Sequence, residues 1–190
     1  MTQQNTSLRQ LILAALFAAL LAVAGQFSIP VGPAPITLQT LIVLLSGLLL
    51  GPRYGPLSII VFIALAGIGL PILSGGSGGV GTLFGPTGGF IFSWPIASFA
   101  IGMLVRWVAK RGEVKFWHLI GVNLLGGSII IFGIGVPWLL ISTGLPFTMN
   151  SLTKTWFIFI PGDLAKVLLS ALIAISLYRV DRRFHPAEKK

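Results

Sequence analysis

Long apolar runs, separated by glycine, proline and basic residues, are the feature of this chain that most restricts its fold. Of its 190 residues, 55% are hydrophobic and 9% are charged, and the mean hydropathy is +0.96. A helix needs about 20 apolar residues to cross a bilayer, where every backbone polar group must be bonded internally. Runs of this length without strand-like alternation are not those of a β-barrel. The sequence therefore predicts an all-α integral membrane protein.

We expect a single domain over residues 1–190, built as a bundle of six transmembrane helices. The expected spans are residues 8–29, 35–50, 54–73, 89–108, 116–141 and 155–180. The first run, with the sequence A-V-A at residues 22–24, can alternatively be interpreted as a cleaved secretory signal. We favour a retained helix, because only Arg9 precedes the run and removal of one span would place the termini on opposite sides, against the charge pattern.

Basic residues fall in alternate connections between the spans, which predicts the orientation of the bundle. They precede the first span, separate the second from the third, surround the turn after the fourth and follow the sixth: Arg9, Arg53, Arg106, Lys110, Arg111, Lys115, Arg179, Arg182, Arg183, Lys189 and Lys190. The positive-inside rule makes this side, and both termini, cytoplasmic. The net charge of +9 is thus explained by topology, with attraction to anionic lipid or an acidic partner, and requires no nucleic acid.

The connections on the opposite side are long, almost uncharged and rich in glycine and proline. The segment Ser74–Gly89, with eight glycines, is either a flexible connector or a loop whose backbone groups bind a small polar ligand. A phosphate-binding Walker loop is excluded, because it requires Gly-Lys-Ser/Thr and neither Lys nor Arg occurs between Arg53 and Arg106. We therefore expect no ATP hydrolysis by this chain, and the lack of cysteine excludes thiolate metal sites.

One acid and one base, Asp163 and Lys166, interrupt the apolar run of the sixth span. Asp163 is the sole acid within the expected spans, and a charge near the membrane interior costs at least about 2–3 kcal/mol. At about 1.5 Å per residue, Asp163 lies roughly 24 Å from the basic boundary at Arg179, in the outer part of the membrane. Residues at i and i+3 share a helix face. The pair is predicted to line a cavity for a small ligand with polar groups and an apolar body.

The acid and the base can alternatively have a purely structural role. Pro161 and Gly162 indicate that the regular helix begins, or begins again, there, so the acid would lie in a first turn and the base would extend to the outer interface. Small residues on the first span, Ala14, Ala18 and Ala22, recur at four-residue spacing. They form either a docking face for another helix or contacts within the bundle.

Four blocks, taken in order along the chain, resemble one family. They are ITLQT (36–40), LLGPRYG (49–55), GPTGG (85–89) and PGDLAK (161–166). Together they are similar to the BioY family, the biotin-specific substrate-capture subunits of energy-coupling factor (ECF) transporters, over nearly the whole chain. The resemblance implies a six-helix protein of a prokaryotic cytoplasmic membrane that binds biotin in a pocket open to the outside. It also implies association with a transmembrane coupling subunit and two cytoplasmic ATPases, and delivery by toppling in the membrane.

The resemblance implies roles for particular residues. Asp163 and Lys166 occupy the positions of the family's acid and base and are expected to contact the ligand. Further candidates are polar side chains and aromatic side chains that would cover the apolar part of the ligand: Gln39, Thr82, Thr87, Phe84, Phe90 and Trp156. The stripe of Ala14, Ala18 and Ala22 becomes an expected contact with the coupling subunit. Phe90 departs from the Tyr common after GPTGG, and the glycine-rich loop supplies no Asn or Arg, so the partner of the ligand carboxylate stays open.

Three functions follow as alternatives. The chain captures biotin, or another small vitamin, for an ATP-driven module; it transports biotin alone; or it is a membrane enzyme or scaffold. An enzyme needs a base or metal poised at its substrate, and the spans contain no second carboxylate. His118 lies near the inner end of the fifth span and His185 in the tail. We therefore expect no enzymatic activity, metal or cofactor.

Overall fold

The computed structural model describes residues 2–30, 34–181 and 184–186, and helices dominate these ranges. The elements, in chain order, are α1 (Thr2–Gln26), β1 (Ser28–Ile29), β2 (Ile36–Thr37), α2 (Gln39–Gly67), η1 (Ser74–Gly76), α3 (Val80–Leu83), α4 (Gly88–Arg111), α5 (Phe116–Asn123), η2 (Leu124–Ser128), α6 (Ile129–Ser142) and α7 (Met149–Val180). The two short strands pair antiparallel, with Ser28 opposite Thr37. The predicted helical class is confirmed, and the predicted tail residues Arg182, Arg183, Lys189 and Lys190 lie outside the described ranges.

Within the described chain, five helical segments are long and apolar enough to cross a membrane, where the sequence predicted six. They are Ser7–Gln26, Gln39–Gly67, Gly88–Arg111, Phe116–Ser142 and Met149–Val180. The difference lies in α2, which joins the second and third predicted spans into one element of 29 residues.

A break at Gly51 divides α2 into two arms. Gly51 has φ 77° and ψ −172°, a conformation that essentially only glycine adopts, and Pro52 then opens the second arm. A straight helix of this length would extend about 43 Å. Instead, Gly25 of α1 contacts both the start of α2 and the chain after its end. A Cβ placed on Gly25 would lie 2.8 Å from both Gln39 Nε2 and the carbonyl of Ile72. The start of α2 and the chain just beyond its end are therefore neighbours, so the two arms are antiparallel.

The helix α7 differs from the sequence expectation at its start. It begins at Met149, where the Thr148 side chain accepts a hydrogen bond from the backbone N–H of Ser151 at 3.2 Å. The helix then continues through Pro161. The prediction that a helix begins at Pro161 and Gly162 is therefore wrong, because a proline in this position removes one backbone hydrogen bond without ending the helix.

Small residues allow α2 and α4 to pack closely in the centre of the bundle. A Cβ on Gly47 would lie 2.7 Å from Ile101, and one on Gly102 would lie 2.4 Å from the backbone of Pro52. The hydroxyls of Ser46 and Ser98 bond across the same contact at 2.8 Å. Such close approach is typical of membrane helices, which associate through dispersion and buried hydrogen bonds.

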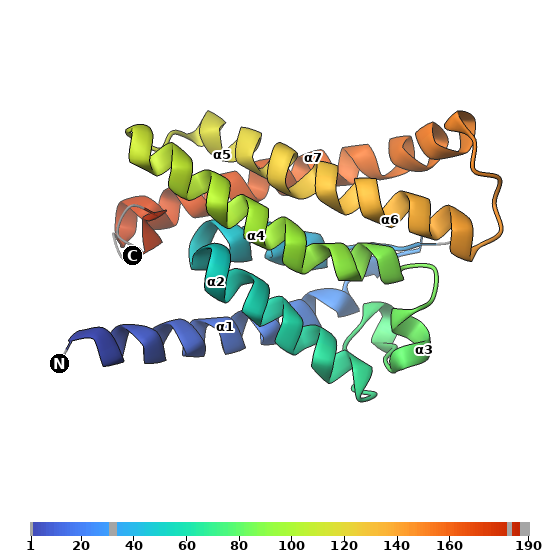
Figure 1. Cartoon of the computed structure of the whole chain (residues 1–190), viewed down its shortest axis with the longest axis horizontal. Helices are drawn as coiled ribbons and strands as arrows, with labels where there is room; N and C mark the ends of the chain where they lie inside the picture. The colour runs from blue at the N-terminus through green and yellow to red at the C-terminus, as the bar shows by residue number, and fades with distance from the viewer. Residues whose placement is uncertain (1, 31–33, 182–183, 187–190) are drawn as a thin grey trace.

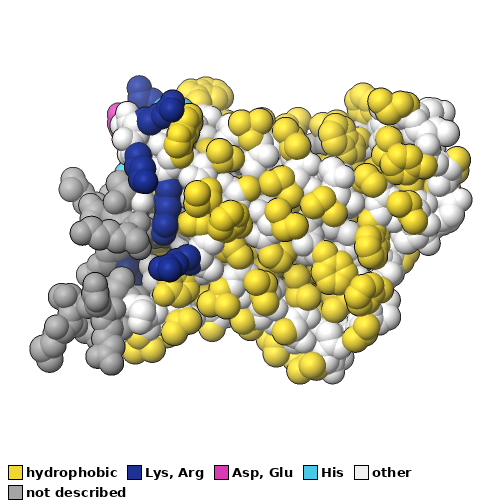
Figure 2. Space-filling model, viewed as in Figure 1, with side chains coloured by type: hydrophobic (Ala, Val, Ile, Leu, Met, Phe, Trp, Pro, Cys, Tyr) yellow, Lys and Arg dark blue, Asp and Glu magenta, His cyan; other side chains and the backbone are white. Residues whose placement is uncertain are grey.

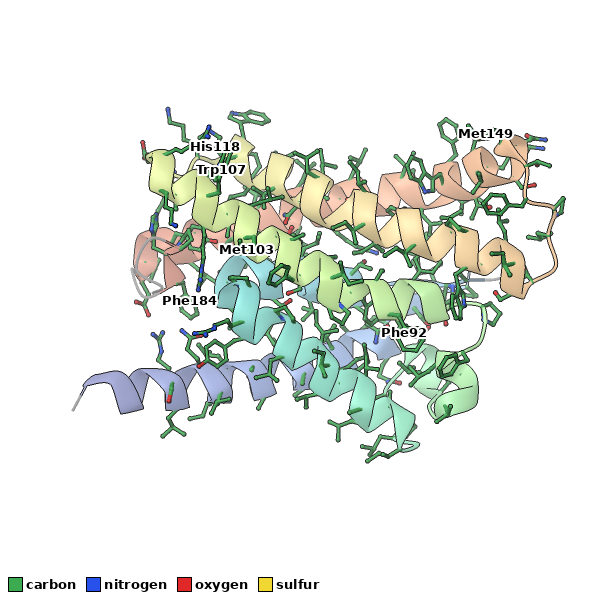
Figure 3. All side chains as sticks on the ribbon, in the orientation of Figure 1. Phe92, Met103, Trp107, His118, Met149 and Phe184 are labelled. Carbon is green, nitrogen blue, oxygen red and sulfur yellow. The ribbon has the colours of Figure 1, made fainter. Side chains whose placement is uncertain are left out.

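The first helix begins and the last helix ends at the same end of the bundle (Figure 1). Arg9 of α1 bonds Asp181, just after α7, at 3.4 Å, which fixes these two segments side by side. Figure 2 shows Lys and Arg side chains gathered at this end, while hydrophobic side chains are spread over the rest of the visible face among other groups. His118 and Trp107 lie toward this end as well, whereas Met149 lies at the other (Figure 3).

Candidate binding cavity

A cavity of about 250 Å³ lies among the ends of several helices and the loops that connect them. Its wall combines the segment around β2, the start of α2, the glycine-rich connection and side chains of α4, α6 and α7: Ala34, Pro35, Ile36, Thr37, Gln39, Thr40, Leu73, Ser74, Ser77, Thr82, Thr87, Phe90, Ile91, Trp94, Ile131, Phe132, Phe159, Asp163 and Lys166. A mostly apolar wall with a few converging polar groups is the usual form of a small-molecule site.

The carboxylate of Asp163 lies on the inner face of α7. The residue is 7% exposed, and its Oδ2 accepts a hydrogen bond from the hydroxyl of Ser128 at 2.5 Å. Ser128 ends η2, which continues directly into α6. The acid is thus held by the neighbouring transmembrane segment, far from the first turn of its own helix.

The ammonium of Lys166 lies three residues further along α7. Its Nζ donates a hydrogen bond to Thr40 Oγ1 at 2.8 Å, connecting α7 to the start of α2. An ammonium has three donors, so further bonds are available to a ligand. Because the side chain turns inward to Thr40 and is half-buried, the alternative in which it extends to the outer interface does not describe this structure.

The acid and the base therefore face one cavity while each bonds a different hydroxyl. Asp163 bonds Ser128, and Lys166 bonds Thr40. This separation leaves acceptor capacity on the carboxylate and donor capacity on the ammonium. The arrangement can bind a small molecule that carries both N–H donors and C=O or carboxylate acceptors, as the sequence predicted.

Aromatic rings form one apolar side of the cavity. Phe90 of α4 lies edge-to-face with Phe132 of α6, with ring centroids 6.2 Å apart, and its centroid is 5.8 Å from that of Phe159 of α7. Three helices thus contribute to one aromatic wall. Rings in such contacts present flat apolar surface to a ligand.

Of the other predicted site residues, four line the cavity. They are Gln39, Thr82, Thr87 and Phe90. The amide nitrogen of Gln39 donates to the carbonyl of Leu21 at 3.2 Å, so this side chain also connects α2 to α1. The hydroxyl of Thr82 donates to the carbonyl of Gly78 at 2.9 Å, within the glycine-rich connection.

Two predicted aromatic residues lie outside the lining. Phe84 is 61% exposed and packs on Phe92 of α4, labelled in Figure 3, with centroids 5.4 Å apart. Trp156 is 42% exposed and contacts Phe132 at a centroid distance of 6.3 Å. Both therefore touch aromatic side chains around the site, and neither forms its wall.

The sequence interpretation missed several residues of the site. Phe159 lies four residues before Asp163, and Trp94 lies four after Phe90, so helical spacing from the predicted residues would have found both. Among the described residues, no acceptor lies within hydrogen-bonding distance of the buried Nε1–H of Trp94. Ser128, the hydrogen-bond partner of Asp163, could not have been found by such spacing, because it lies on a different helical segment.

The small-residue stripe on α1 has a different register from the one expected. Ala14 and Ala18 are 5% and 6% exposed and pack inside the bundle, and Ala22 is half-buried. The neighbouring pair Ala15 and Ala19, also four residues apart, is exposed. Ala14 and Ala18 therefore pack within the bundle, and Ala15 and Ala19 are the pair that another helix could reach.

In the described part of the chain, no three His, Cys, Asp or Glu residues come together as metal ligands would. His118 interacts locally instead, where its Nδ1 accepts from the backbone N–H of Lys115 at 3.2 Å at the start of α5.

Comparison with known proteins identifies the family. The model of the BioY family matches residues 1–183. This chain belongs to the BioY family. The family resemblance inferred from the four sequence blocks is therefore confirmed.

Relatives of this BioY-family chain match it along most of their length. The protein named biotin transporter BioY from Rhodobacter capsulatus is 41% identical over 182 residues, which cover 90% of this chain and 95% of that protein. The one of the same name from Thermotoga maritima is 38% identical over 179 residues, covering 92% and 98%. The crystal structure of the S-component for biotin from an ECF-type ABC transporter superimposes with a TM-score of 0.87 at 34% identity, over 97% of this chain and 99% of that one.

Proposed function

We propose that this chain binds biotin from outside the cell and serves as the substrate-specific subunit, or S component, of an ECF-type vitamin transporter. Membership of the BioY family and the match to an S-component for biotin support this function. The observation that carries it is the cavity itself, in which Asp163 and Lys166 face the same space without bonding each other.

The chemistry of biotin suits this cavity. The carboxylate of Asp163 accepts hydrogen bonds from the ureido N–H groups, and the ammonium of Lys166 donates to the ureido oxygen or to the valerate carboxylate. The rings of Phe90, Phe132 and Phe159 cover the apolar bicycle and chain. Gln39, Thr82 and Thr87 supply further polar contacts from the opposite segments of the wall. No cofactor and no catalytic step is needed for this function.

The membrane orientation follows the distribution of charge. The end of the bundle that carries the Lys and Arg side chains (Figure 2) faces the cytoplasm, with both termini on that side (Figure 1). The two arms of α2 count as separate spans, which gives six in all. The cavity then opens toward the outside of the cytoplasmic membrane, and one domain performs the whole task.

Energy for uptake comes from partner subunits. The chain associates with a transmembrane coupling subunit and two cytoplasmic ATPases, in agreement with the lack of a Walker loop in its own sequence. The exposed face of α1 around Ala15 and Ala19 is the docking surface, because small residues permit close approach of another helix. The toppling of the subunit then delivers biotin inward.

Two measurements test this function. Mass spectrometry of the protein, purified in detergent without added vitamin, should identify biotin among the bound small molecules. Uptake of labelled biotin should then be measured in cells that lack their own biotin transport, with and without the coupling subunit and the ATPases. Uptake that depends on the ATPases supports the S-component assignment. Equal uptake without them would favour transport by this chain alone, and a different copurified vitamin would refute biotin as the substrate.

A further inference from the structure

The segment between α5 and α6 is a single wide turn inside one transmembrane helix. In this turn, η2, the backbone N–H of Ile129 donates to the carbonyl of Leu124, five residues earlier. An α-helical bond would reach back four residues, so this π-helical turn contains one extra residue. Such turns are rare and occur frequently at functional sites.

The extra residue changes which side chains share a face. Asn123 precedes the turn and Ser128 ends it. In a regular α-helix, residues five apart point about 140° away from each other. Across a turn closed by i→i+5 bonds, residue i+5 lies almost above residue i, as residue i+4 does in an α-helix. The π turn therefore directs Asn123 and Ser128 to the same neighbour.

That neighbour is α7, and each of the two side chains bonds it. Asn123 Nδ2 donates to Ser170 Oγ at 2.8 Å, and Ser128 Oγ donates to Asp163 Oδ2 at 2.5 Å. Ser170 and Asp163 are seven residues apart, two turns along one face of α7. All four side chains are buried. The two bonds thus fix the register of the α5–η2–α6 segment against α7, and one of them ends at the acid of the cavity.

Two glycines allow the wide turn to fit. A Cβ on Gly126 would lie 2.9 Å from the backbone nitrogen of Ile101 on α4, and one on Gly127 would lie 2.4 Å from Leu44 on α2. Neighbouring helices therefore contact the turn where it has no side chains, which holds it in place from both sides.

We propose that Ser128, placed by this π turn, is a positioning residue for Asp163. Its hydroxyl engages Oδ2 and so orients the carboxylate with Oδ1 available to the ligand. A carboxylate rotated away from this orientation would present its oxygens at the wrong angle for the N–H groups of a bound molecule. The role in binding rests on the proposed function, with biotin as the ligand, whereas the orientation of the carboxylate does not depend on it.

The test compares Ser128→Ala with Ser58→Ala in the full-length protein. Ser58 is a matched control, because it is also buried but its hydroxyl bonds only the carbonyl of Gly55 in its own helix, at 2.7 Å. The first measurement is the infrared carboxylate band of Asp163, identified by its loss in Asp163→Asn. The second is the Kd for biotin, by titration of the purified protein.

We expect Ser128→Ala to shift the carboxylate band and to raise the Kd for biotin about tenfold, since a carboxylate that is free to rotate makes less well aligned, and therefore weaker, hydrogen bonds to the N–H groups of the ligand. Ser58→Ala should change neither quantity. An unchanged band, or an unchanged Kd, in Ser128→Ala would overturn the proposal. If the wild-type protein binds no biotin, the proposed function fails instead, and the band still decides whether Ser128 orients Asp163.

Discussion

Removal of the Lys166 ammonium is expected to weaken biotin binding while the chain stays folded. Substitution Lys166→Met keeps most of the aliphatic stem and deletes the group that bonds Thr40 at 2.8 Å beside the cavity. The same ammonium is expected to donate a hydrogen bond to biotin, and such a bond from a charged group contributes about 1.5–3 kcal/mol to binding. Each 1.4 kcal/mol is about tenfold in affinity. The Kd for biotin should therefore rise about 10- to 100-fold.

The effect on stability should be smaller than the effect on binding. The substitution removes the bond to Thr40, and it also removes the desolvation of a half-buried cation, so the two contributions oppose each other. Thermal unfolding of the variant in detergent should therefore stay close to that of the wild type. A weakened affinity in a folded protein would then report the loss of a ligand contact.

Binding is measured by calorimetric titration of the purified protein, with Lys154→Met as the matched control. Lys154 lies on the same helix, α7, and is exposed. Its substitution removes the same charge from the same element and should leave the Kd unchanged. If Lys166→Met and the control bind biotin equally well, the ammonium has no part in the binding site.

Three further substitutions test the cavity, the fold and the docking surface. Gly135→Ala should weaken biotin binding, because a Cβ there would lie 2.2 Å from Phe90 and displace that ring from the aromatic wall, whereas Gly133→Ala on the same helix meets no atom within 4 Å and should bind normally in the same titration. Gly51→Ala should lower the free energy of unfolding by about 1–3 kcal/mol in a denaturation experiment, since φ at this position is 77°; equal stability would show that the break does not need glycine. Ala19→Trp should abolish ATPase-dependent uptake but spare biotin binding, because a large side chain there would keep a partner helix from approaching α1. Normal uptake by this variant would show that the docking surface lies elsewhere.

The sequence is most informative where a residue conflicts with its surroundings. Asp163 and Lys166 are charges in an apolar run, and the free energy needed to place them there is itself an indication of a cavity. The structure puts both at one cavity and adds their partners, Thr40 and Ser128. A serine or threonine in a membrane helix carries little cost, so neither partner produces a signal of its own.

Other features depend on geometry that spacing does not determine. On α1, the pair Ala14 and Ala18 and the pair Ala15 and Ala19 have the same four-residue spacing, and only burial in the folded bundle separates the inward pair from the outward one. The continuation of α7 through Pro161 is similar, because tertiary contacts can maintain a helix where local preference would end it.

Biotin binding in this cavity is tested by titration of the purified wild-type protein, prepared free of vitamin and compared with Asp163→Asn. If Asp163 contacts biotin in the cavity, the wild-type protein binds at one site with a Kd below micromolar, and the variant, whose amide replaces the carboxylate, binds clearly more weakly. No binding by the wild-type protein below micromolar, or equal affinity in the two proteins, would contradict this prediction.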